Sequence, residues 1–103
     1  MCIYGISFRL EDGDVNGRTY DERYEALQAA ILDGTTKFWD QTDSFFVIES
    51  RRSIDEIARK CKQAIEPSTD LILVRELSGS PTRISGNNRD PDLFKLMPYV
   101  KYC

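Results

Sequence analysis

Residues 38–65, FWDQTDSFFVIESRRSIDEIARKCKQAI, and residues 70–77, DLILVREL, carry most of the information about the fold. Residues 37–40 and 44–49 are rich in aromatic and β-branched side chains, and polar residues separate the two runs. This pattern predicts a β-hairpin. The second stretch contains four consecutive apolar residues and predicts a further strand.

The remaining elements follow from periodicity and capping signals. Ser53 and Glu56 form a capping box that begins a helix, and Pro67 follows its end. Residues 2–10 alternate apolar and polar side chains, as a strand does, whereas residues 21–33 repeat apolar side chains every three or four positions, as an amphipathic helix does. The order is strand, helix, strand, strand, helix, strand, which predicts an α+β fold of the ferredoxin-like βαββαβ type.

The chain has 103 residues, a common size for one domain. We predict a ferredoxin-like domain over residues 1–79 and a C-terminal extension over 80–103, packed on the domain or on a partner subunit. Asp90 followed by Pro91 predicts a short helical turn at 92–97 in this extension. No apolar run reaches the roughly 20 residues of a membrane span, and the N-terminus lacks a signal-peptide pattern, so we expect a cytoplasmic protein.

One face of the predicted sheet has no cover within the first 79 residues, because two right-handed crossovers place both helices on the other face. Apolar side chains nevertheless alternate onto both faces of the third and fourth strands. A second copy of the chain is the simplest cover. The predicted homodimer interface consists of Phe45, Val47, Leu71, Leu73, Tyr99 and Tyr102. We further predict that residues 99–103 cross to the partner, with docking of the extension on its own subunit as the alternative.

The N-terminal strand, the 38–65 segment and the 70–77 strand together resemble the SinR-like small ferredoxin-like proteins. These are related to the small CRISPR adaptation subunit and to virulence-associated protein D. The resemblance covers about residues 2–79 and implies a homodimer, with binding or metal-dependent cutting of nucleic acid in the CRISPR and virulence branches. Such nucleases carry an aspartate near the end of the first strand, where this chain has Ser7. Because a neutral hydroxyl is a poor ligand for a hard cation, we predict no catalytic residue.

Several cations gather at the start and along the polar side of the second helix. The candidate nucleic-acid-binding residues are Arg51, Arg52, Arg59 and Lys62. Asp55 and Glu56 lie in the same region and the net charge is −3, whereas nucleic-acid-binding surfaces are usually basic. A solvated helix face is therefore the favoured interpretation.

The stretch DGDVNG at residues 12–17 matches the first half of a calcium-binding loop. Asp12, Asp14 and Asn16 occupy the first, third and fifth positions, and they are the candidate metal ligands. The twelfth position is Arg23 instead of glutamate, and the same residue types also favour a simple chain reversal.

The three cysteines are far apart and the chain has no histidine, so neither a zinc site nor a histidine-based catalytic site is predicted. We expect a small homodimeric interaction module associated with nucleic acid, without catalysis or a bound cofactor. One alternative is a nuclease of the CRISPR adaptation subunit type that depends on a divalent metal ion, such as Mg²⁺, at Asp12 or Asp14. The other is a module that binds Ca²⁺ through residues 12–17.

Overall fold

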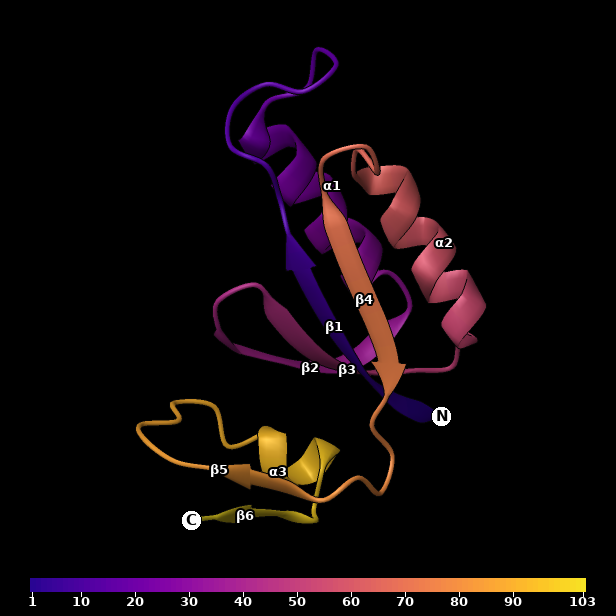
Figure 1. Ribbon diagram of the computed structural model, residues 1–103. Coiled ribbons are helices and arrows are strands. Elements are labelled where there is room, and N and C mark those ends of the chain that lie inside the picture. Colours follow the sequence, from indigo (N-terminus) through magenta and orange to yellow (C-terminus); the bar gives the residue numbers. More distant parts are fainter.

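The computed structural model describes all 103 residues and has a four-stranded antiparallel sheet with two helices on one face (Figure 1). The strand order is β2-β3-β1-β4, which places the N-terminal strand in the middle of the sheet. The predicted α+β, ferredoxin-like architecture is confirmed. Its elements are β1 (Cys2–Arg9), α1 (Tyr20–Leu32), β2 (Thr35–Thr42), β3 (Phe45–Ser50), α2 (Ile54–Ala64) and β4 (Leu71–Glu76).

Side-chain caps begin both long helices. The Thr19 hydroxyl accepts the backbone N–H of Glu22, whose carboxylate accepts the N–H of Thr19, and this reciprocal pair starts α1. At α2, the Ser53 hydroxyl accepts the N–H of Glu56, which is one half of the predicted capping box; the reciprocal bond from the Ser53 N–H to the Glu56 carboxylate is not formed. These bonds satisfy backbone donors that have no partner inside the helix.

The hairpin between β2 and β3 is tighter than the sequence indicates. β2 runs to Thr42 instead of ending at Asp40, because a register shift between Trp39 and Thr42 carries polar residues into the strand. The turn then consists of Asp43 and Ser44, and Ser44 has a positive φ of 57°.

The face of the sheet that meets the helices holds the larger core. Residues of β1 and β3 that alternate along each strand pack against apolar residues of α1 and α2. The buried members are Tyr4, Ile6, Phe8, Leu10, Leu27, Ile31, Phe46, Ile48, Ile57, Cys61, Ala64 and Ile65.

The C-terminal segment covers part of the opposite face, here called the outer face (Figure 1). It contains β5 (Thr82–Ile84), the short helix α3 (Leu93–Leu96) and β6 (Val100–Tyr102). A second buried cluster joins it to β2 and β3 and consists of Trp39, Val47, Leu93, Leu96, Met97 and Val100. This cluster fixes the C-terminal segment on its own subunit in the structure.

The strand β6 pairs with β5 of the same chain in parallel, with Val100 opposite Thr82. Exchange of residues 99–103 between two copies stays a prediction. The short helix begins at Leu93, one residue later than expected, and the Asp90 carboxylate accepts the N–H of Asp92 just before it. No helix combines the length and the apolar character that crossing a membrane requires.

We predict that Leu93→Ala lowers the free energy of unfolding by about 2–4 kcal/mol, because Leu93 is buried between the C-terminal segment and the sheet. Ile54→Ala, at an exposed site on α2, serves as the control, and we expect it to cost about 1 kcal/mol or less. Urea denaturation of both variants measures the difference. Equal stability of the two variants would contradict docking of the segment on its own sheet.

Candidate functional site

The loop between β1 and α1 contains a tight reversal at its second half. Val15 and Arg18 exchange two backbone hydrogen bonds of 2.9 and 3.0 Å. The two residues between them, Asn16 and Gly17, both have positive φ angles, 51° and 81°. This is the geometry for which Asn-Gly is the preferred sequence in two-residue hairpin turns.

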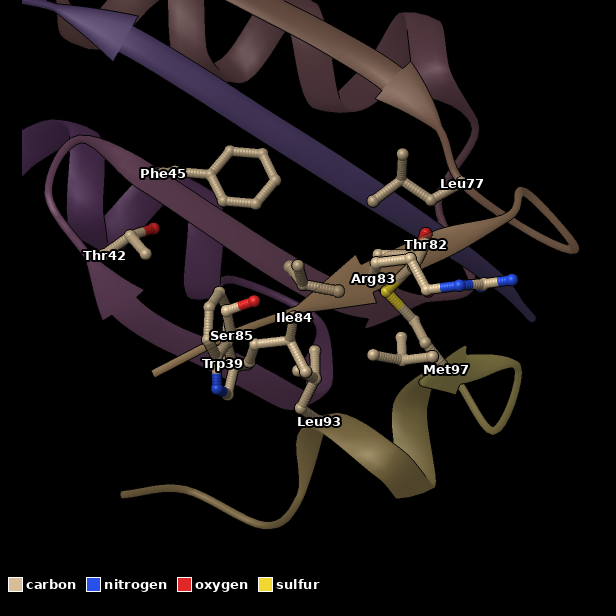
Figure 2. A pocket seen from close by; sticks show the side chains of 12 residues that line it. Trp39, Thr42, Phe45, Leu77, Thr82, Arg83, Ile84, Ser85, Leu93 and Met97 are labelled. Carbon is tan, nitrogen blue, oxygen red and sulfur yellow. The ribbon is translucent and has the colours of Figure 1, made fainter. Parts of the chain in front are cut away.

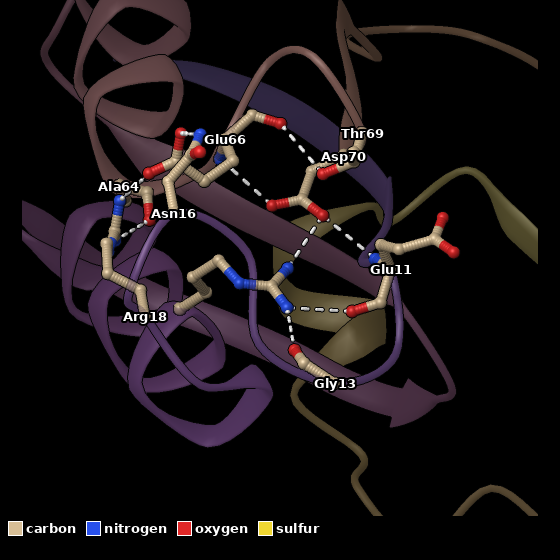
Figure 3. A network of polar contacts seen from close by, with 9 residues as sticks. Glu11, Gly13, Asn16, Arg18, Ala64, Glu66, Thr69 and Asp70 are labelled. Carbon is tan, nitrogen blue, oxygen red and sulfur yellow. Dashed lines mark hydrogen bonds and ion pairs between the residues drawn. The ribbon is translucent and has the colours of Figure 1, made fainter.

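The first half of the same loop is held by the buried side chain of Arg23. Figure 3 shows its partners Glu11, Gly13 and Asp70. Arg23, on the first turns of α1, has no exposed surface, and its Nη2 donates to the carbonyl oxygens of Glu11 and Gly13 at 2.8 and 2.7 Å. Its Nη1 forms a 2.7 Å ion pair with Asp70, whose side chain is also fully buried. The Asp70 carboxylate additionally accepts the backbone N–H groups of Glu11 and Glu66 at 2.8 and 2.9 Å.

This network joins four parts of the chain that are distant in sequence: the 11–13 loop, α1, the end of α2 and the start of β4. Burial raises the pKa of Asp70, but the backbone donors of Glu66 and Glu11 and the Arg23 guanidinium outweigh it, so the pKa lies below its ordinary value. The carboxylate is therefore ionised at neutral pH. Both charged side chains of the ion pair are fully buried, so we assign the network a structural role.

The structure does not bring the candidate metal ligands into a cluster. Asp12 and Asp14 are exposed, whereas the Asn16 amide donates to Glu66 at 3.1 Å. No group of three or more acidic or cysteine side chains has an arrangement that could hold a metal ion. The residue at the twelfth loop position, Arg23, donates to the carbonyl oxygens of Glu11 and Gly13, so a positive charge lies where the calcium motif needs a glutamate.

Ser7 lies on the outer face of β1 with neighbours that are apolar. In the sheet register it stands opposite Phe45 of β3 and Leu73 of β4. The outer face therefore presents no carboxylate at the positions beside Ser7, and Asp12 lies beyond the end of the strand.

The predicted nucleic-acid-binding cations fall into two groups. Arg52 forms ion pairs with Asp33 and Glu56, at 3.2 and 3.6 Å. Three others, Arg51, Arg59 and Lys62, are exposed and form no ion pair. Nucleic-acid binding by these three residues stays a prediction.

The cysteines do not form a reactive group. Cys61 is completely buried in the helix-side core, and burial raises the pKa of its thiol to about 11. A thiol in such surroundings stays protonated and is inert as a nucleophile. Cys103 is exposed near the hydroxyl of Ser85, and Cys2 lies at the start of β1.

A cavity of about 380 Å³ lies between the outer face and the C-terminal segment (Figure 2). Figure 2 shows Phe45 and Leu77 on one side and Leu93 and Met97 on the opposite side, with Ile84 of β5 between them. This cavity could not be identified from the sequence, because its two walls come from segments whose relative placement does not follow from hydrophobic periodicity. The lining residues are Trp39, Thr42, Phe45, Val47, Leu77, Thr82, Arg83, Ile84, Ser85, Leu93, Met97 and Val100.

Gly5 allows the cavity wall to lie close to the sheet. A Cβ atom at this position would stand 2.9 Å from a methyl group of Leu77 and 3.2 Å from the ring of Phe45. Both side chains therefore rest over the backbone of β1, where a larger residue would displace them.

The residues predicted for a dimer interface are distributed unevenly. Val47 is buried under the C-terminal segment, whereas Leu71 and Leu73 of β4 are 53% and 62% exposed. Tyr99 donates its hydroxyl to the carbonyl of Leu77, and the exposed ring of Tyr102 packs beside Phe94, with ring centroids 5.5 Å apart. Phe45 is half-buried beside the cavity.

No family model, curated protein or solved structure matches the chain. The resemblance to the SinR-like proteins therefore stays a prediction.

We predict that Arg23→Met destabilises the protein by about 3–5 kcal/mol, because it leaves the Asp70 carboxylate buried without its counter-charge. Arg51→Met removes an exposed arginine with no ion pair and should change stability by about 0.5 kcal/mol or less. Chemical denaturation at pH 7 separates the two variants. A loss of under about 1 kcal/mol in Arg23→Met would show that the buried pair does not hold the loop and α1 together.

Acid should weaken the fold through Asp70. Its pKa is lowered in the folded state, so its contribution is complete above the unfolded-state value, about 3.9, and is lost as the pH falls through the folded-state value. We therefore expect Asp70→Asn to show a smaller loss of stability than wild type between about pH 5 and pH 2. Asp12→Asn, at an exposed carboxylate without a hydrogen bond, is the control for the general effect of removing one acid. Parallel acid dependence in wild type and Asp70→Asn would contradict this role.

Proposed function

We propose that the chain is a non-catalytic interaction module that acts in the cytoplasm as a homodimer. The observation that carries this proposal is the pair of exposed leucines, Leu71 and Leu73, on the outer face of β4. The C-terminal segment packs on β2 and β3 and leaves these two side chains uncovered.

β4 is also suited to association because it is an edge strand. It pairs with β1 on one side only, so its other side presents unpaired backbone groups. Natural proteins usually protect such edges with charges or a covering segment. Arg75 and Glu76 place charges at the end of β4, whereas its start, at Leu71 and Leu73, is apolar.

A two-fold axis beside β4 would bring the leucines of one copy against the same residues of the other. The resulting interface is isologous, the commonest arrangement among soluble oligomers. Ser7 and Arg9, which lie opposite Leu73 and Leu71 in β1, would form its polar rim. Two leucines make a small apolar centre, so the dimer we propose is weak and reversible.

Support for a non-catalytic role comes from the surroundings of Ser7. Phe45 and Leu73 flank it, and neither can ligate a cation or transfer a proton. The position at which the resembled nucleases hold an aspartate thus belongs to the apolar outer face.

We expect Leu71→Thr/Leu73→Thr to be monomeric at concentrations at which wild type is dimeric. Threonine keeps the preference for a strand while it removes most of the apolar surface. Ile54→Thr, at an exposed apolar site in the helical layer, is the control and should leave the dimer unchanged. Sedimentation velocity over about 5–500 μM covers the weak range that a small interface implies. A wild-type protein that stays monomeric throughout, or a double variant that dimerises as wild type does, would refute the proposal.

A further inference from the structure

We propose that the cavity between the outer face and the C-terminal segment binds a small amphipathic carboxylate. The apolar body of the ligand would lie between Phe45, Leu77 and Leu93, and its carboxylate would approach the exposed guanidinium of Arg83. This site is separate from the leucines of the proposed dimer interface, neither of which lines the cavity.

The size and the lining of the cavity favour a small molecule. Its volume of about 380 Å³ lies within the range of roughly 300–1,000 Å³ that ligand sites occupy. Eight of its 12 lining residues are hydrophobic, so most of its wall would contact an apolar body. Burial of that body supplies the affinity, at about 25 cal/mol per Å² of apolar surface removed from water.

The cavity exists because β5 does not join the main sheet. β5 pairs only with β6. No backbone hydrogen bonds join it to β3, and side chains fill the space between the two strands. Ile84 and Thr82, which share one side of β5, fill part of this space, and the remainder is the cavity.

The polar groups around the cavity determine the charge of the ligand. Arg83 is the only charged residue of the lining, and no acidic side chain contributes to it. Its Nη1 donates to the carbonyl of Thr82 at 2.9 Å, while its other donors have no protein partner. The hydroxyl of Thr42 likewise has no protein partner, and it can donate to a ligand oxygen. An anionic end with oxygen acceptors matches this set of donors.

Trp39 gives a direct signal for occupancy. It is the one tryptophan of the chain, it lines the cavity, and its indole N–H donates to Asn88 at 2.9 Å. A molecule that enters the cavity contacts the indole, so intrinsic fluorescence should change with binding.

The test uses decanoate and decan-1-ol, which have the same apolar chain and differ in the charge of one end. We expect decanoate to bind the full-length protein at one site, with a dissociation constant on the order of 0.1–1 mM, by calorimetry and by Trp39 fluorescence. Decan-1-ol should bind about three-fold more weakly, because the exposed guanidinium adds only a modest interaction. Absence of saturable decanoate binding at about ten times that concentration would overturn the proposal.

Two variants locate the site. Thr42→Phe fills the cavity from an exposed position and should weaken decanoate binding at least about ten-fold, whereas Thr36→Phe, at the other end of β2, should leave it unchanged. Arg83→Gln should reduce decanoate binding to the level of decan-1-ol, and Arg89→Gln, outside the cavity, is its control.

The remaining outcomes also decide the proposal. Binding that persists in Thr42→Phe but disappears in Leu71→Thr/Leu73→Thr would assign decanoate to the exposed leucines and overturn the cavity site. Equal binding of the acid and the alcohol, unaffected by Arg83→Gln, would overturn the assignment of an anionic ligand. Circular dichroism of each variant confirms that the fold is kept before binding is compared.

Discussion

The buried ion pair between Arg23 and Asp70 is the interaction on which the arrangement of the helices and the sheet depends. Both side chains are fully removed from solvent, and the carboxylate accepts two further backbone N–H groups. Such a pair stabilises the folded state little more than apolar residues of similar volume would. Removal of either charge, however, leaves the other one buried and uncompensated. The pair therefore acts mainly by fixing positions. β4 can begin only where Asp70 reaches α1, and the loop between β1 and α1 must pass where the carbonyls of Glu11 and Gly13 reach Arg23. One Arg23 donor, Nε, has no partner, so the network is not complete.

Much of the fold is readable from the sequence, because periodicity and capping residues act locally. The Ser53 cap, the alternation in β1 and the order of elements all agree with the structure. Arg23 shows where this reasoning stops. It lies four residues before Leu27 and eight before Ile31, in the buried stripe of α1, yet a charged residue in a helix is ordinarily assigned to solvent. Its partner is 47 residues away, and no local pattern could identify it.

The candidate site was less predictable than the fold for the same reason. Apolar residues on both sides of β3 indicate correctly that the outer face needs cover, but they do not say which segment supplies it. That depends on the direction in which the chain leaves β4, which brings Leu93 and Met97 against Trp39. The importance of Gly5 is likewise visible only once Phe45 and Leu77 are in place above it. The reversal within residues 12–17, in contrast, could be read locally, since Asn16-Gly17 is a preferred turn sequence and both residues have positive φ angles.

The central position of β1 has a consequence for synthesis on the ribosome. β1 is translated before both of its neighbours: its edge toward β3 can pair only after residue 50 has left the exit tunnel, and its edge toward β4 only after residue 76. Contacts between residues so distant in sequence form slowly, and an exposed strand edge can pair with other chains in the meantime. Arg9 at the end of β1 and the charged loop that follows it, with Glu11, Asp12 and Asp14, would then protect the nascent chain by repelling its copies on neighbouring ribosomes.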